Sequence, residues 1–258
     1  MDIREDTWLA NIFGCPVFKI ETHSAAPLPD DSTSQLRELV DSHARQQAEA
    51  LYYAKVDTKQ VEVVRQLSGA GLFVVDVNVT FRIDTKAHLN HVEAKEVSGL
   101  SINEIEPSHN DATLEIAESC FQYSRFHLDP LVPPSIANRI KRDWILNYIR
   151  GQRGERLFVA LDGARPVGFL AVIATETNDQ RTCTIDLIGV RQDFQRLGVG
   201  RALTAFFIRH YREQCDYLTV GTQAANIPSM RLYQSVGFFI SQTQYVMHGH
   251  VGHEGLNA

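Results

Sequence analysis

A glycine-rich turn near residue 198 holds the residues whose types and spacing point most directly to chemistry. It reads Gln195-Arg196-Leu197-Gly198-Val199-Gly200-Arg201, follows an apolar strand that ends at Val190, and opens a helix. Glycines at a helix start let the backbone approach a ligand closely, and the free N–H groups there point at negative charge. Because the helix dipole adds partial positive charge at the same end, this turn is suited to hold phosphate oxygens.

A second motif lies downstream, where Asn226 is followed seven residues later by Tyr233 and then by Gly237-Phe238. Together, the two motifs resemble the GNAT N-acetyltransferases, whose Gln/Arg-x-x-Gly-x-Gly loop grips the pyrophosphate of acetyl-CoA. The resemblance implies an α/β (α+β) fold, with a mixed, mostly antiparallel twisted sheet flanked by helices. It also implies an acyltransferase that uses acetyl-CoA as cosubstrate.

The resemblance assigns cofactor contacts to both motifs. The strand end Ile188-Gly189-Val190 would pair with the pantetheine arm through its backbone, and an N–H there would polarise the thioester carbonyl. The amides from Arg196 to Arg201 would bind the pyrophosphate, with the two arginines either adding charge or lying solvated on the helix. Asn226 would hydrogen-bond the cofactor arm, cap the following helix, or do both.

Proton transfer is predicted to involve Tyr233 and Asp186. A tyrosine hydroxyl has an unperturbed pKa of about 10, so it is protonated at neutral pH and can donate to the departing CoA thiolate. The alternative is a half-buried tyrosine on an amphipathic helix. Many family members place a carboxylate where this chain has Thr184, and Asp186 has the same side-chain parity. Glu176, His127 and a water relay stay open as alternatives for the general base.

The acceptor side is predicted from the segment between Cys120 and Gly151, which contains Arg125, His127 and Trp144. This segment resembles the dTDP-fucosamine acetyltransferase type, so an amino-deoxysugar nucleotide is the implied acceptor. Arg125 would pair with a diphosphate in bidentate fashion or stack within the helix connection, and His127 is the second substrate-binding candidate. Direct attack of the amine on the thioester is expected, because no cysteine–histidine nucleophile pair is evident.

Two other functions fit the same motifs. The first is acetyl transfer to a different small amine, such as an amino acid, a polyamine or an aminoglycoside. The second is a non-catalytic module that binds acetyl-CoA. The presence of Asn226 and Tyr233 beside an intact glycine turn favours catalysis over this last function.

A polar stretch at residues 84–111 divides the chain into two expected domains. Residues 101–258 are the expected catalytic domain, with helices at 112–124, 135–150, 201–214 and 228–235 and strands at 157–161, 167–174, 182–190, 217–222 and 238–247. Residues 1–100 are an expected partial GNAT-like domain that shapes the acceptor pocket, because Val64–Val75 can be laid over Met230–Ser241. The alternative, in which the overlay reflects only the general similarity of any helix, turn and strand, stays open.

Composition and charge limit the partners and cell locations that we expect for this protein. The 258 residues carry a net charge of −6, which gives no support for a nucleic-acid partner. We expect no membrane contact, since no apolar run reaches spanning length and no signal peptide is visible. The four cysteines lack metal or disulfide spacing, so reduced thiols and a cytoplasmic location are expected.

Two expectations concern the end of the chain. His248, His250 and His253 have no metal-binding spacing beside a suitable carboxylate, so we expect a loose tail and no metal. The strand at 238–247 is expected at a sheet edge, which would allow a homodimer.

Overall fold

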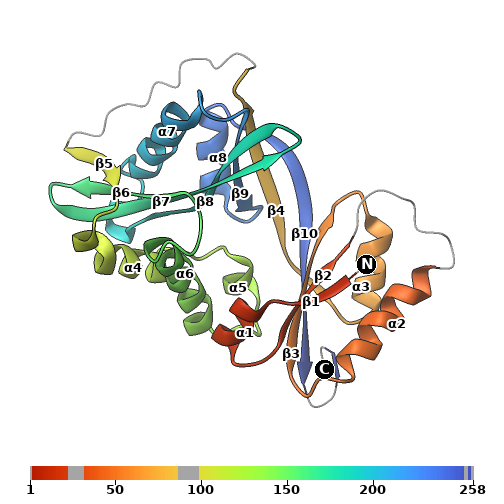
Figure 1. The fold of residues 1–258 in the computed structure, drawn as a ribbon. Helices are drawn as coiled ribbons and strands as arrows, with labels where there is room; N and C mark the ends of the chain where they lie inside the picture. Colours follow the sequence, from red (N-terminus) through yellow and green to blue (C-terminus); the bar gives the residue numbers. More distant parts are fainter. Residues whose placement is uncertain (1, 23–31, 87–98, 253–254, 257–258) are drawn as a thin grey trace. The chain divides into compact units, whose positions relative to one another are not determined.

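The computed structural model describes residues 2–22, 32–86, 99–252 and 255–256. The chain divides into two units that each gather segments from distant parts of the sequence (Figure 1). Unit 1 comprises residues 1–78, 125–136 and 242–258, and unit 2 comprises residues 79–124 and 137–241. The predicted boundary near residue 100 therefore differs from this division, because most of the strand Phe239–Gly252 belongs to the same unit as the N-terminal residues.

Unit 1 is built around the strand order β1-β2-β3-β10. β10 runs antiparallel to β3, with Gln244 opposite Asp57 and Val251 opposite Ala50. The strand that was expected at an edge is therefore paired over residues 244–251, which corrects that prediction. The elements are β1 (Asp2–Glu5), α1 (Thr7–Phe13), β2 (Val17–Glu21), α2 (Ser32–Ala44), β3 (Ala50–Asp57), α3 (Val61–Gly69), α5 (Arg125–Leu128), β11 (Gly255–Leu256) and parts of β4 (Phe73–Asp84) and β10 (Phe239–Gly252).

Unit 2 follows the strand order β4-β9-β8-β7-β6-β5, in which β8 and β9 are parallel and β5 to β8 are antiparallel. This is the predicted mixed, mostly antiparallel sheet. The elements are β5 (Leu100–Glu104), η1 (Pro107–His109), α4 (Asn110–Ser119), most of α6 (Pro134–Ile149), β6 (Arg156–Asp162), β7 (Arg165–Thr177), β8 (Gln180–Val190), η2 (Gln192–Phe194), α7 (Val199–Tyr211), β9 (Tyr217–Gln223), α8 (Ile227–Ser235) and the remaining parts of β4 and β10.

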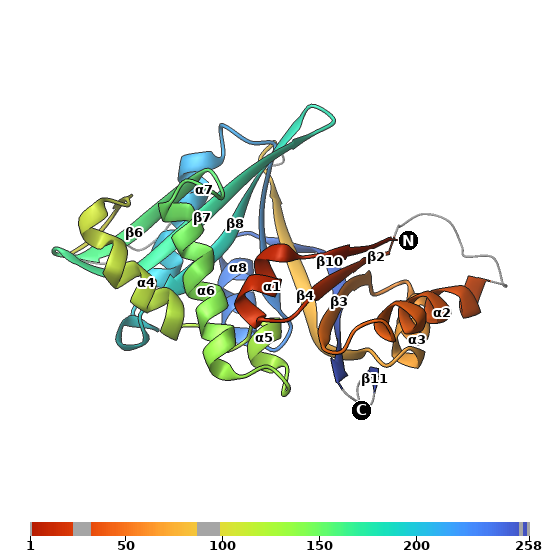
Figure 2. The same ribbon diagram turned by 60° about the horizontal axis from the view of Figure 1, so that its bottom comes forward.

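Helices cover both faces of the sheet in unit 2 (Figure 2). On one face, Leu203 and Phe207 of α7 join a buried cluster with Cys183 and Leu218. On the other, apolar side chains of α4 and α6 pack on Phe169 and Ala171 of β7. Burial on both sides explains why β7 reads as a continuous apolar run rather than as an alternating strand.

The chain repeats a strand, helix, strand, helix, strand succession, first as β2, α2, β3, α3 and β4 and again as β8, α7, β9, α8 and β10. β2 pairs in parallel with β3 from Val17 opposite Leu51 to Ile20 opposite Ala54. β8 pairs in parallel with β9 from Thr182 opposite Tyr217 to Ile185 opposite Val220. Both ladders cover four residue pairs and both end at an isoleucine followed by a carboxylate residue, Glu21 or Asp186.

The backbone turn after the second helix is also the same in both units. The Leu72 N–H donates to the Leu67 carbonyl over 2.9 Å, and the Phe238 N–H donates to the Tyr233 carbonyl over 3.0 Å. The intervening glycines, Gly71 and Gly237, have φ angles of 95° and 94°, a region that disfavours a Cβ. The alignment of residues 64–75 with 230–241 therefore has matching backbone geometry.

Two further observations bear on expectations about cell location. Cys183 on β8 and Cys215 before β9 form a disulfide with Cα atoms 6.0 Å apart, which corrects the expectation that all cysteines are reduced; Cys15 and Cys120 are free. The parallel pairing of β8 with β9 brings the two segments together. Among the described residues, no helix combines the length and apolar character needed to span a membrane. The cytoplasmic location stays a prediction.

Candidate active site

β8 and β9 separate partway along their length. Their parallel pairing ends at Ile185 opposite Val220, although β8 continues to Val190 and β9 to Gln223. The predicted segment Ile188–Val190 lies in the separated part, so its β9-facing backbone groups are not used in that ladder. An extended ligand can hydrogen-bond to such an edge as an added strand would.

The glycine-rich turn follows directly and opens α7. Arg196 and Gly198 have positive φ angles of 63° and 92°, and Gly198 is the N-cap of the helix. Because glycine has no side chain to cap the helix, the first-turn amides keep their free N–H groups. The Gln195 side chain donates to the Val190 carbonyl over 3.2 Å, which ties the turn to the end of β8.

The two arginines of the turn differ. Arg201 donates to the Ser235 hydroxyl on α8 over 2.8 Å, so it is partly engaged in holding the two helices together. Arg196 is exposed. Leu197 between them is 60% exposed, and a single exposed leucine is ordinary on a protein surface.

Asn226 and Tyr233 lie at the two ends of α8. The Asn226 side chain accepts a hydrogen bond from the Ser229 N–H over 3.3 Å, which is the N-cap role named as one alternative. Tyr233 is 3% exposed, and its ring packs against Phe81 and Phe238. Burial raises the pKa of Tyr233, so its hydroxyl stays protonated at neutral pH.

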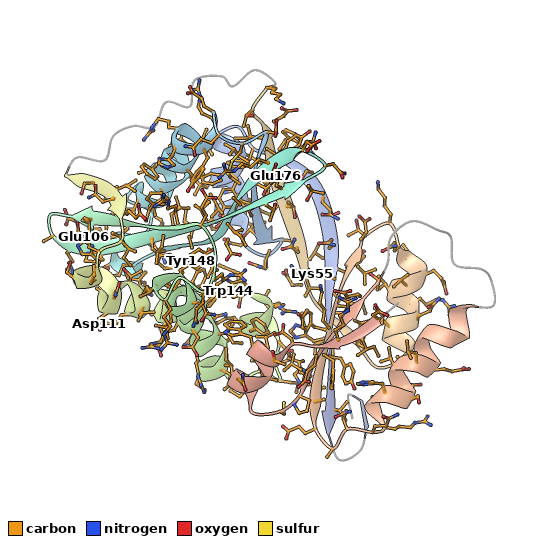
Figure 3. All side chains as sticks on the ribbon, viewed as in Figure 1. Lys55, Glu106, Asp111, Trp144, Tyr148 and Glu176 are labelled. Carbon is orange, nitrogen blue, oxygen red and sulfur yellow. A yellow bond between two sulfur atoms is a disulfide. The ribbon has the colours of Figure 1, made fainter. Side chains whose placement is uncertain are left out.

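Asp186 is held by donors from α6 and the loop after it. Its carboxylate accepts hydrogen bonds from Trp144 Nε1 over 2.8 Å, from the Tyr148 hydroxyl over 2.7 Å, and from Arg153 over 2.7 and 2.9 Å. Trp144 and Tyr148 lie one turn apart on α6 (Figure 3). Burial opposes ionisation of Asp186, but the hydrogen bonds and charge of Arg153 outweigh it and keep the pKa of the carboxyl below its usual range.

This arrangement argues against Asp186 as the general base, because its oxygens are occupied and its proton affinity is lowered. A bulge between Ala171 and Val172 in the β7–β8 register produces the arrangement: Leu187 lies opposite Ala171 and Ile185 opposite Val172, so Asp186 is the extra residue. Sequence reasoning missed all three donors; the i, i+4 spacing of Trp144 and Tyr148 was the available signal.

Glu176, another base candidate, is not brought to this end of the sheet. Glu176 is exposed and lies opposite Arg181 beside the turn between β7 and β8, whereas Val190 lies opposite Gly168 at the far end of the same strand pair. Figure 3 shows Glu176 at that turn. His127 belongs to unit 1.

Cys120 lies beneath the strand end of the candidate site. A Cβ built on Gly189 would lie 2.7 Å from the Cys120 sulfur and 2.5 Å from the Phe169 ring, so β8 requires glycine at this position. Burial raises the pKa of the Cys120 thiol to about 12. A thiol that stays protonated is a poor nucleophile, which agrees with direct attack rather than an acetyl-cysteine intermediate.

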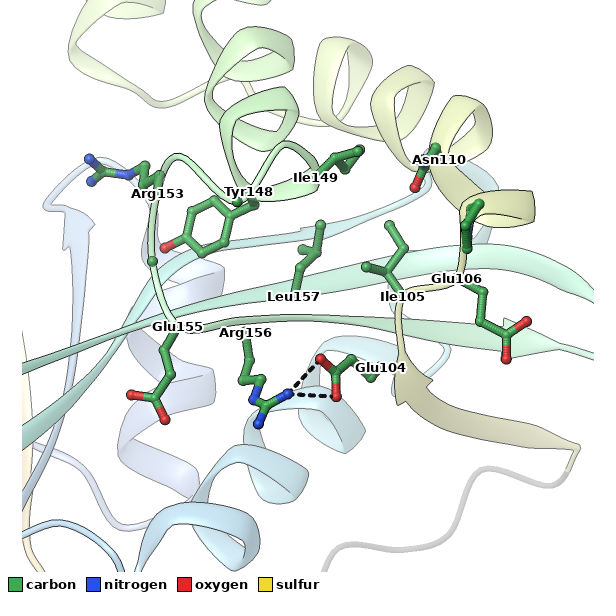
Figure 4. A pocket seen from close by; sticks show the side chains of 13 residues that line it. Glu104, Ile105, Glu106, Asn110, Tyr148, Ile149, Arg153, Glu155, Arg156 and Leu157 are labelled. Carbon is green, nitrogen blue, oxygen red and sulfur yellow. Dashed lines mark hydrogen bonds and ion pairs between the residues drawn. The ribbon is translucent and has the colours of Figure 1, made fainter.

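An open cavity of about 220 Å³ lies beside the donors of Asp186 (Figure 4). Tyr148 and Arg153 form part of its lining, and Glu104 and Arg156, which pair over 2.7 Å, lie across it. The cavity is distinct from the glycine-rich turn, because no residue of the turn lines it.

Arg125 and His127, the predicted substrate-binding residues, lie on α5 in unit 1. The Arg125 guanidinium lies 3.9 Å from the centroid of the Tyr53 ring and 4.4 Å from that of Phe126. Burial lowers the pKa of Arg125, and its Nη1 atom has no hydrogen-bond partner among the described residues. The guanidinium thus stacks within unit 1, as the alternative held, and the substrate role of both residues stays a prediction.

Two of the three late histidines are not in a loose tail. His248 and His250 lie on β10, and both contact Oδ2 of Asp129: His248 Nδ1 over 2.6 Å and His250 Nε2 over 2.8 Å. Burial lowers the pKa of His248 to about 4. The tail prediction is wrong for these two residues because the pairing of β10 with β3 places them in a strand, whereas His253 lies outside the described residues.

Comparison with known proteins agrees with this geometry. Residues 111–238 match the acetyltransferase (GNAT) family. The spore coat polysaccharide biosynthesis protein SpsD of Bacillus subtilis (strain 168) is 29% identical over 144 residues, which are 55% of this chain and 48% of SpsD. The chain therefore matches about half the length of this relative.

Solved structures share the fold across nearly the whole chain. A GCN5-related N-acetyltransferase from Sphaerobacter thermophilus superposes with a TM-score of 0.63 at 14% identity, covering 96% of this chain and 75% of that one. A tandem GNAT protein from the clavulanic acid biosynthesis pathway gives 0.57 at 13% identity, covering 93% and 76%. Residues 111–238 of this chain thus belong to the acetyltransferase (GNAT) family.

Proposed function

We propose that the protein transfers the acetyl group of acetyl-CoA to the amine of an amino-deoxysugar nucleotide. The observation that carries the proposal is the separation of β8 from β9 shortly before α7, whose N-cap residue, Gly198, makes no side-chain cap bond. The strand edge suits the amide-bearing arm of the cofactor, and the helix N-terminus suits its pyrophosphate.

In the proposed reaction the neutral amine attacks the thioester carbonyl carbon. A C–N bond forms, the C–S bond breaks, and the CoA sulfur leaves as a thiolate. A backbone N–H within Ile188–Val190 stabilises the oxyanion of the tetrahedral intermediate. Tyr233, whose raised pKa keeps its hydroxyl protonated at neutral pH, donates a proton to the thiolate and takes one back from solvent. The proton of the amine passes to solvent through water, and Asp186 acts as a positioning residue that anchors Arg153 and α6.

Two observations support the choice of acceptor and the role of unit 1. The name of the relative SpsD, a spore coat polysaccharide biosynthesis protein, supports a sugar-derived acceptor. The shared ladder and turn geometry support unit 1 as a partial copy of the same fold, and a tandem GNAT protein superposes over most of this chain. We propose that unit 1 has kept the scaffold and contributes no second acetyl-transfer centre.

An acceptor panel tests the proposal. Thiol release from acetyl-CoA is followed with 3-amino and 4-amino deoxysugar nucleotides, beside an amino acid, a polyamine and an aminoglycoside. The proposal expects turnover with a sugar nucleotide to exceed turnover with every simple amine. Higher turnover with a simple amine would show that the proposed acceptor class is wrong. Acetyl-CoA binding with no turnover on any amine would favour a binding module.

A further inference from the structure

We propose that Asp129, His248 and His250 form a binding site for a divalent transition metal ion, with Zn²⁺ the expected ion. The three side chains come together within unit 1 and take no part in the acetyl-transfer proposal. One ligand atom from each lies within 4.8 Å of the others.

The backbone fixes the convergence of these groups. His248 and His250 are two residues apart on β10, so their side chains project from the same face of the strand. Asp129 follows α5, and its Oδ1 accepts a hydrogen bond from the Leu131 N–H over 2.9 Å. That bond orients the carboxylate so that Oδ2 faces both imidazoles, at 2.6 Å and 2.8 Å.

The donor set selects the class of ion. Two imidazole nitrogens and one carboxylate oxygen suit Zn²⁺ and neighbouring transition metals, whereas Ca²⁺ and Mg²⁺ prefer oxygen ligands alone. Three protein ligands leave a fourth tetrahedral position for water. The Asp129 carboxylate supplies one negative charge, which offsets part of the charge of the ion.

Burial gives the site a rigid wall and one open side. The side chains of Asp129 and His248 are 0% exposed, whereas that of His250 is 22% exposed, which provides an entry path for the ion. The Phe73 ring stacks on His250 at a centroid distance of 6.2 Å, and the Phe126 ring lies 5.9 Å from that of His248. Such an apolar shell restrains the imidazoles and limits solvent access to the ion.

A bound ion would join chain segments far apart in sequence, the connection after α5 and the C-terminal half of β10. Because a ligand that binds only the folded state stabilises it, metal binding should raise the thermal midpoint of the protein. The competing arrangement is a hydrogen-bonded triad of the same three side chains that binds no metal.

The test uses the full chain without a polyhistidine tag, stripped with a chelator and dialysed against ZnCl₂. Elemental analysis is expected to find one zinc per chain, and the thermal midpoint should rise relative to the stripped protein. Co²⁺ in place of zinc should give the intense visible absorption of a four-coordinate site. Less than a tenth of an equivalent of zinc in the wild type, on the order expected of trace contamination, overturns the proposal.

Variants localise the binding. His250→Gln changes the most exposed ligand, and it should weaken zinc affinity by at least about tenfold, because even changes to outer-sphere partners of a metal cost 10–100-fold. Asp129→Asn keeps the shape of the side chain and should weaken binding at least as much. His210→Gln, an exposed histidine on α7 in unit 2, is the matched control and should leave affinity unchanged. Zinc affinity unaltered in both ligand variants places the ion elsewhere and overturns the assignment.

Discussion

Units 1 and 2 use the same backbone plan with different side chains at the positions where chemistry is expected. Gln60 and Asn226 are the N-caps of α3 and α8, with φ and ψ angles of −90° and 57° against −86° and 64°. Only Asn226 accepts a hydrogen bond with its side chain. Buried Leu67 aligns with buried Tyr233. The scaffold can thus persist where the polar groups of the site do not.

The strand that precedes the first helix of each succession shows the same contrast. Glu21, after the ladder of β2, pairs with Lys19 and Arg4 at the surface. Asp186, after the ladder of β8, accepts hydrogen bonds from Trp144, Tyr148 and Arg153. A carboxylate at the same place in the fold is therefore a surface charge in one unit and a structural anchor in the other.

The largest expected effect is a loss of kcat on changing Tyr233, with no such loss on changing the aligned residue Leu67. Tyr233→Phe should lower kcat by about 10²-fold or more, the contribution typical of a general acid, with little change in folding. Leu67→Met is the matched change in unit 1; a volume-conserving core swap costs less than about 1.5 kcal/mol and should leave kcat unaltered. Steady-state kinetics at saturating acetyl-CoA measures both. Wild-type kcat in Tyr233→Phe would remove this residue from the mechanism.

The second effect is a loss of folding stability that we expect to be larger for a change at Asp186 than for one at Glu21. Asp186→Asn should destabilise the protein by about 1.5–3 kcal/mol, since charged hydrogen bonds to Arg153 are lost. Glu21→Gln should cost about 0–1 kcal/mol, as expected of a surface ion pair. Denaturant unfolding at pH 7 compares them. Unchanged stability of Asp186→Asn together with a shifted pH–rate profile would restore Asp186 as the base.

The Asp186 contribution also has a defined pH dependence. Its pKa in the folded protein lies below the unfolded value of about 3.9, so its stabilising effect is complete above that value and is lost as the pH falls through the folded pKa. The stability difference between wild type and Asp186→Asn should therefore be largest near neutral pH and shrink below a pH of about 4. Unfolding curves at pH 7 and pH 3 check the sign, and a difference that grows in acid would contradict it.

A third change should act equally in the two units. Gly71→Ala and Gly237→Ala each place a Cβ at a positive φ angle, which costs about 1–2 kcal/mol. The Gly237 position has open space around the added atom, so the backbone angle alone accounts for the cost. Thermal unfolding of both variants measures it. A large loss in only one of them would show that the two turns are less alike than their hydrogen bonds indicate.

The smallest effect separates the two N-caps. Asn226→Ala should cost about 1 kcal/mol, because a helix amide loses its acceptor. Gln60→Ala should cost no more than a few tenths of that, since Gln60 makes no side-chain cap bond. Equal losses in urea unfolding would contradict the assigned caps.

The catalytic-domain fold was predictable because its signals are local. The apolar residues that form β7 are consecutive in the sequence, and the glycines of the turn that precedes α7 are two residues apart. Each pattern can therefore be recognised from a few adjacent residues. The same holds for the overlay of residues 64–75 on 230–241, whose turn glycines share a φ angle.

Features that depend on long-range pairing could not be read in the same way. No local pattern shows that β10 pairs with β3, so the sequence predicts a tail at His248 and His250 and an edge position for the strand. The bulge that leaves Asp186 as an extra residue depends on the register of β7 with β8, and its donor Arg153 lies in a loop. Contacts between side chains from distant segments depend on how the strands and helices pack, which no single stretch of sequence specifies.

The central claim is that cofactor binding belongs to the turn in unit 2 and that unit 1 has only the scaffold. Isothermal titration of acetyl-CoA into the full chain tests it, with Gly198→Val as the disruptive variant and Gly237→Ala as a control for strain at a positive φ angle. The account predicts one acetyl-CoA per chain, with binding lost in Gly198→Val and kept in Gly237→Ala. Two equivalents per chain, or undiminished binding in a folded Gly198→Val protein, would contradict it.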